Sequence, residues 1–153
     1  MTKIVTKETM HDEVGKETGV SSWFEITQED VNTFADVTRD HQFIHVDPEK
    51  AAQTPFGGPI AHGFLTLSML SYFSGDGCGI SIENAKMGVN YGCDKIRFLS
   101  PVRVGARIRG RAKLVSVDEK SPGQFLFKQE YTVEIEGVEK PALIAEWLAL
   151  IIV

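Results

Sequence analysis

The sequence has few cysteines and no apolar run long enough to cross a lipid bilayer. Its two thiols, Cys78 and Cys93, have neither the paired spacing of metal ligands nor the context of a disulfide-rich domain. The longest apolar runs, residues 60–73 and 142–153, fall short of the roughly 20 residues that a membrane-spanning helix needs. Residues 1–16 lack the apolar core of a signal peptide. We therefore expect a cytoplasmic protein with free thiols and no membrane partner.

An excess of positive charge is also absent. The chain has 16 Lys and Arg against 21 Asp and Glu, a net charge of −5, which argues against a nucleic-acid partner. Its histidines lack a coherent ligand spacing, so no metal is expected: His11, His41, His45 and His62. With no repeat, low-complexity tract or linker, residues 1–153 are expected to form one domain, in which residues 1–20 are the least determined.

Helical signals come early in the chain. Thr27 is a good N-cap for a helix ending near Thr38, and Asp47 followed by Pro48 begins a second, short helix. The most apolar helix, residues 61–73, has almost no polar side, which predicts burial on all sides.

Beyond residue 86 the apolar periodicity changes from 3.6 to 2. Arg107, Arg109, Arg111 and Lys113 occupy every second position, which is typical of a strand with one solvated face. Residues 143–152 are almost continuously apolar, so we expect that strand inside the sheet or against a partner. A buried helix followed by four or five long antiparallel strands indicates an α+β fold with the sheet curled around the helix. The edges of such a sheet would be stabilised by a second subunit.

Asp40 and His45 are the candidate acid/base pair. They are five residues apart in a segment between two predicted helices, where both side chains can turn toward one water. Alternatively, Asp40 caps a turn and His45 is an ordinary polar residue before a helix. The spacing by itself favours this second interpretation, because the pattern is unspecific.

Gly63 is the candidate for stabilising negative charge. It lies at the start of the apolar helix, where backbone amides are free and no side chain obstructs a ligand. Close packing of the helix on the sheet would explain this glycine equally well. We expect the neighbouring His62 to be structural rather than a second catalytic imidazole.

The residues Thr38–Asp47 together with Phe56–Gly63 resemble the signature of the MaoC-like dehydratases, also called R-specific enoyl-CoA hydratases. The resemblance extends through Asn90–Gly92 and Arg97–Val102 and covers roughly residues 22–150. It implies a hot-dog fold, in which a curved antiparallel sheet wraps a long helix, and a homodimer. It also implies a catalytic dyad of Asp40 and His45, with the Gly63 N–H as oxyanion donor.

Ser71, on the apolar helix, matches a family serine that helps to arrange the site, although a hydrogen bond to its own backbone is an equally good explanation. The chain departs from the commoner family motif in two places: Arg39 replaces a glycine, and Gln42-Phe43 replaces Asn-Pro. If that glycine has a positive φ, the arginine costs on the order of 1 kcal/mol.

The resemblance implies reversible hydration of a trans-2-enoyl-CoA to an (R)-3-hydroxyacyl-CoA, with CoA as part of the substrate and no separate cofactor. Lys95, Arg97 and Arg103 are candidates for contacting the CoA phosphates. Two alternatives remain open: an acyl-CoA thioesterase on the same fold, and a non-catalytic acyl-binding subunit.

Overall fold

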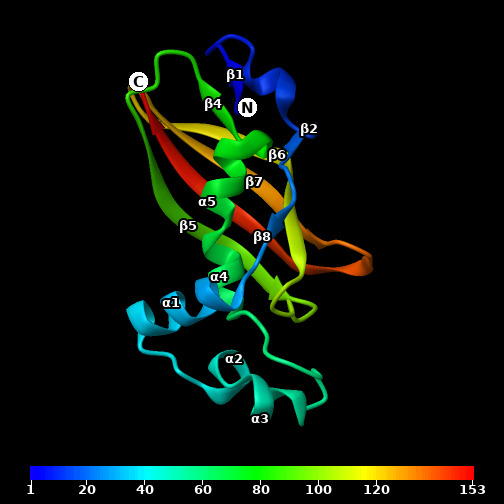
Figure 1. The fold of residues 1–153 in the computed structure, drawn as a ribbon. Helices are drawn as coiled ribbons and strands as arrows, with labels where there is room; N and C mark the ends of the chain where they lie inside the picture. Colours follow the sequence, from blue (N-terminus) through cyan, green and yellow to red (C-terminus); the bar gives the residue numbers. More distant parts are fainter.

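A computed structural model describes residues 1–153, and its main element is a six-stranded antiparallel sheet (Figure 1). The strand order is β2 (Glu17–Val20), β6 (Arg107–Ser121), β7 (Gln124–Ile135), β8 (Val138–Ile152) and β5 (Met87–Phe98), and β3 (Phe24–Glu25) also pairs with β6. The predicted α+β hot-dog arrangement is confirmed. Strand β8, whose sequence is the most continuously apolar, lies between β7 and β5 as expected.

The alternation predicted for residues 107–113 is present in β6. Ile108, Gly110 and Ala112 are buried, while the basic side chains between them lie on the other face. These cations pair with glutamates of neighbouring strands: Arg109 and Arg111 contact Glu134 at 2.6 and 2.9 Å. The basic row is therefore an ion-paired sheet face.

The apolar helix forms two consecutive short helices, α4 (Gly63–Ser68) and α5 (Leu70–Phe73), followed by a wide turn over Ser74–Cys78 (η2). They lie across the concave side of the sheet (Figure 1). Packing is close, because a Cβ added at Gly110 of β6 would lie 2.8 Å from the Phe73 Cβ.

The expectation that this helix is buried on all sides is wrong for the single chain. Phe64 is 67% exposed and Tyr72 45% exposed. The physical reason is that the sheet covers one side of the helix, whereas the opposite side is covered only in part, as by Phe24 of β3 against Tyr72.

The N-terminal segment, undetermined from sequence, packs at the far end of the sheet. Strand β1 (Lys3–Val5) pairs in parallel with β4 (Ile80–Ile82), which was not predicted from the sequence. A 3₁₀ helix (η1, Met10–Glu13) follows β1. Their apolar side chains join Phe125 and Phe127 in a second, smaller core.

Three helices lie at the opposite end, beside the start of α4 (Figure 1): α1 (Gln28–Thr38), α2 (Phe43–Val46) and α3 (Pro48–Ala52). Thr27 and Asp30 form a reciprocal capping box at α1, and the Asp47 side chain caps α3, as predicted. The short helix α2 was not predicted. No helix in the structure has the length and apolarity to traverse a bilayer.

Candidate active site

Asp40 lies in the short connection between α1 and α2. The chain turns there because Arg39 adopts a left-handed conformation, with φ 67° and ψ 15°. The Asp40 carboxylate accepts a hydrogen bond from the Gln42 N–H at 3.3 Å, and its side chain is 54% exposed. Asp40 therefore does stabilise a turn, and it also presents a carboxylate at the surface of the site.

His45 lies in α2 and is buried, with 6% of its surface exposed. Its Nδ1 is 2.6 Å from the carbonyl oxygen of Ile60. Because a carbonyl only accepts, Nδ1 must carry a proton, and Nε2 is left with a lone pair in the neutral ring. Burial lowers the pKa of His45, and the nearby His62 lowers it further, against the opposing effects of the Ile60 hydrogen bond and the Asp40 charge. The neutral, proton-accepting form is thus favoured.

His62 is the residue whose place in the site was missed. It precedes α4 and is 3% exposed, with its ring stacked on that of His45 at a centroid distance of 3.9 Å. Its Nε2 donates to the backbone oxygen of Asp40 at 3.0 Å and lies 4.0 Å from the Asp40 carboxylate. The only signal in the sequence was its position directly before Gly63.

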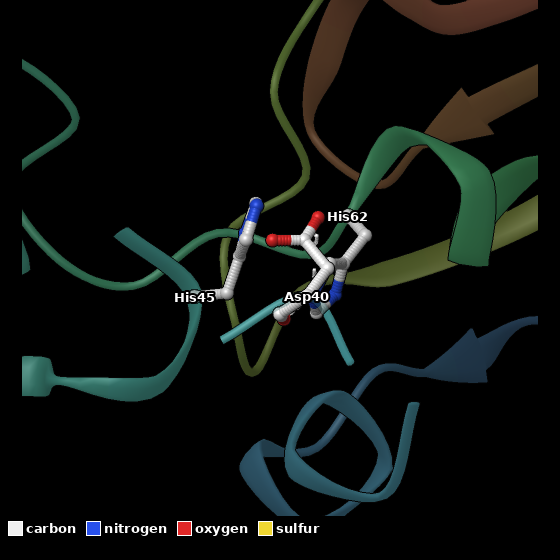
Figure 2. Close-up of side chains that lie close together, drawn as sticks. All are labelled: Asp40, His45 and His62. Carbon is white, nitrogen blue, oxygen red and sulfur yellow. Dashed lines mark hydrogen bonds and ion pairs between the residues drawn. The ribbon is translucent and has the colours of Figure 1, made fainter. Parts of the chain in front are cut away.

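The three side chains lie close together (Figure 2). One ligand-type atom from each of Asp40, His45 and His62 lies within 4.8 Å of the other two. Two imidazoles and a carboxylate are a possible metal-binding set by composition. However, the ring centroids are 3.9 Å apart and the ring planes are inclined by only 25°, so the in-plane lone pairs lie in nearly parallel planes and cannot meet at one position about 2.0–2.1 Å from both nitrogens. The two stacked imidazoles are therefore not arranged to coordinate one metal ion together.

Gly63 shares a cavity of about 240 Å³ with His45. As the first residue of α4, Gly63 has no acceptor for its N–H inside the helix. Phe98 and Ser100 also line the cavity, and a Cβ on Gly63 would lie 3.0 Å from the Phe98 ring. The cavity is therefore lined both by an imidazole and by a residue whose backbone N–H has no acceptor in the helix and no side chain beside it.

The remaining candidates lie elsewhere on the chain. Ser71 lines a separate cavity of about 320 Å³, together with Asn90 and Trp147. Lys95 and Arg97 line a third cavity.

Comparison with known proteins identifies the family to which the chain belongs. Residues 9–136 match the model of the MaoC like domain. Nodulation protein N of Rhizobium leguminosarum bv. viciae is 48% identical over 139 residues, which are 90% of this chain and 86% of the relative. The 3-hydroxyacyl-thioester dehydratase Z of Mycobacterium tuberculosis (strain ATCC 25618 / H37Rv) is 48% identical over 132 residues, 86% of either chain.

A solved structure, the (R)-hydratase from A. caviae involved in PHA biosynthesis, superimposes with a TM-score of 0.72 at 25% identity. The match covers 90% of this chain and 95% of that one. The family model spans most of the chain, and both curated relatives match well over two thirds of it. This chain therefore belongs to the family of MaoC-like domain proteins.

Proposed function

We propose that this protein reversibly hydrates a trans-2-enoyl-CoA to an (R)-3-hydroxyacyl-CoA. The observation that carries the proposal is the single cavity onto which the His45 imidazole and the free Gly63 N–H open, with the Asp40 carboxylate beside that imidazole (Figure 2). Two relatives, a 3-hydroxyacyl-thioester dehydratase and an (R)-hydratase, support this reaction class.

The reaction begins with a water held between the Asp40 carboxylate and the Nε2 lone pair of His45. The dyad takes one proton from the water as its oxygen forms a bond to C3 of the substrate. The electron pair of the C2–C3 double bond moves to C2 and, through conjugation, onto the thioester oxygen. The dyad then returns the proton to C2. Only the elements of water are added, so no electron carrier is required.

The Gly63 N–H is placed to stabilise the charge on the thioester oxygen. One such donor contributes about 3–4 kcal/mol to transition-state stabilisation in characterised enzymes. Its contribution is realised in the transition state, because the neutral substrate carbonyl accepts a weaker hydrogen bond than the developing oxyanion does.

Arg103 is the best placed of the three candidate cations for the CoA phosphates. It is exposed, follows the cavity-lining Val102, and forms no ion pair within the chain. In contrast, Lys95 lies 3.8 Å from Glu146, and Arg97 shares its cavity with the carboxylates of Glu130 and Glu146. A phosphate would be repelled by those carboxylates.

A homodimer is part of the proposal. Strand β5 is an edge of the sheet and exposes apolar side chains, and so does the uncovered side of α4 and α5. The exposed residues are Met87, Val89, Tyr91, Phe98, Phe64 and Tyr72. A long apolar edge strand is an aggregation hazard unless it is covered, and a second copy of the chain would cover it.

The test is a paired assay with crotonyl-CoA and its saturated analogue. We expect loss of the enoyl absorbance with crotonyl-CoA and no release of free CoA thiol from either compound. Thiol release with an unchanged enoyl group would instead identify a thioesterase. Binding of CoA esters with neither reaction would identify a non-catalytic acyl-binding subunit.

A further inference from the structure

We infer that His62 is a positioning residue, whose single imidazole holds the Asp40 backbone and the His45 ring in register with the Gly63 N–H. The inference rests on the proposed function and adds a residue to it. His62 acts through the groups that it holds, Asp40 and His45, and takes no part of its own in the proton transfer.

The first contact is with Asp40. The Nε2–H of His62 donates to the Asp40 carbonyl at 3.0 Å. Asp40 lies outside any helix, and its carboxylate has one backbone partner, the Gln42 N–H at 3.3 Å. The hydrogen bond from His62 therefore anchors the connection between α1 and α2 to a buried ring, and this restricts the movement of the Asp40 carboxylate.

The second contact is with His45. The His62 ring lies against His45 at 3.9 Å and also contacts Phe34 of α1, at a centroid distance of 4.9 Å. A ring packed in this way restricts the rotation of the His45 imidazole about its side-chain bonds. The hydrogen bond from Nδ1 of His45 to Ile60 and the stacking on His62 together fix the orientation of the His45 ring, and with it the direction of the Nε2 lone pair.

The third relationship is covalent. The carbonyl of His62 belongs to the same peptide as the Gly63 N–H, and it accepts hydrogen bonds from the N–H groups of Leu65 and Thr66 at 3.0 and 3.2 Å. In a trans peptide the C=O and N–H point in opposite directions, so the Gly63 N–H must point out of the helix. The conformation of His62 thus sets the direction of the oxyanion donor.

Stability alone does not account for an imidazole at this position. The Nδ1 of His62 is buried and has no hydrogen-bond partner within the chain. A buried polar atom without a partner is unfavourable, and a phenyl ring of similar shape would avoid that cost. The hydrogen bond to Asp40 is the contact that a phenyl ring could not make.

This contrast defines two variants of the full chain. His62→Phe keeps an aromatic ring against Phe34 and His45 but removes the donor to Asp40. His62→Gln removes the ring but can place an amide N–H near the position of Nε2. A control, His41→Gln, makes the same change at a half-exposed histidine whose partner is Asp36 at 2.7 Å.

We expect His62→Phe to have a Tm equal to or above the wild type, yet a kcat for crotonyl-CoA hydration reduced by up to about 100-fold with little change in KM. His62→Gln should recover part of that kcat while its Tm falls, and His41→Gln should change neither. Activity and stability thus move in opposite directions between the two variants. A wild-type kcat in His62→Phe, or a kcat that follows Tm in both variants, would overturn the inference.

A second readout does not depend on turnover. The NMR signals of the Asp40 carbonyl carbon and the Gly63 amide should shift in His62→Phe, and the carbonyl signal should return toward the wild-type position in His62→Gln. Signals that stay unchanged in His62→Phe would reject the positioning role. If the wild type lacks hydratase activity, the proposed function fails, and these signals alone decide the role of His62.

Discussion

The Nδ1 of His45 and the carbonyl oxygen of Ile60 are 2.6 Å apart, a contact that determines which ring nitrogen is free. Ile60 belongs to the stretch that leads into α4, whereas His45 lies in α2. The hydrogen bond therefore links the segments that contain His45 of the proposed dyad and the proposed oxyanion donor Gly63, and it leaves Nε2 as the nitrogen with a free lone pair.

Replacing Asp40 tests the carboxylate. Asp40→Asn keeps an oxygen that accepts from the Gln42 N–H, so the fold should be retained while hydration of crotonyl-CoA falls by about 10²–10⁴-fold. The control is Asp36→Asn, an exposed carboxylate of α1 whose partner is His41, and it should leave turnover unchanged. Near wild-type turnover in Asp40→Asn would exclude this residue from the dyad.

The lowered pKa of His45 predicts how stability changes with pH. Because burial lowers the folded-state pKa below the ordinary value of 6.5, the unfolded chain binds more protons in the window between the two values. The stability contributed by neutral His45 is present above pH 6.5 and is lost as the pH falls through that window. Thermal unfolding between about pH 7 and 5 should show a smaller decrease in Tm for His45→Gln than for the wild type.

The same shift predicts the pH profile of activity. If neutral His45 accepts the proton, the acid limb of kcat/KM in the wild type should lie below pH 6.5, the value for an ordinary histidine. An acid limb above that pH would mean that another group controls the rate.

Gly63 offers a nearly isolated test of the oxyanion donor. Gly63→Pro removes the N–H at the first helical position, where proline is tolerated, and His62 already has the extended conformation (φ −59°, ψ 137°) that a following proline requires. Gly63→Ala is the matched control, because its Cβ meets the same Phe98 ring but its N–H remains. We expect kcat of the proline variant to be about 10²–10³-fold below that of the alanine variant. Equal rates would assign Gly63 a packing role only.

Replacing Arg39 tests how much the left-handed backbone conformation of this residue lowers the stability of the fold. Its φ of 67° is a conformation that glycine adopts without strain, so Arg39→Gly should raise the free energy of unfolding by about 1 kcal/mol, a Tm increase of about 2–4 °C. Arg39→Lys removes the guanidinium but keeps the strain, and should be no more stable than the wild type. Equal stability of the glycine and lysine variants, measured by denaturant unfolding, would argue against backbone strain.

The exposed edge strand tests the homodimer. Sedimentation equilibrium should give twice the 16.9 kDa chain mass for the wild type and the monomer mass for Val89→Asp, which puts a charge on β5. The control is Val138→Asp, a valine of similar exposure (48%, against 44% for Val89) at the start of β8. A monomeric wild type would contradict the proposed homodimer.

The sequence by itself determined the elements whose signals are local. The Thr27 and Asp47 caps predicted where α1 and α3 begin, and the period of two predicted β6. Such patterns are readable because capping and the alternation of strand faces involve residues close in sequence. The motif around Asp40, His45 and Gly63 likewise identified the family, which was then confirmed.

Only the tertiary structure decided the relationships between distant segments. No local pattern shows that the His62 ring stacks on His45, that Ser71 faces a different cavity, or that Phe64 is left uncovered. The pairing of β1 with β4 joins residues far apart in the chain, so neither strand had a nearby partner from which to predict it. These features depend on how the sheet curls around α4 and α5, and that curvature is set by the packing of the whole chain.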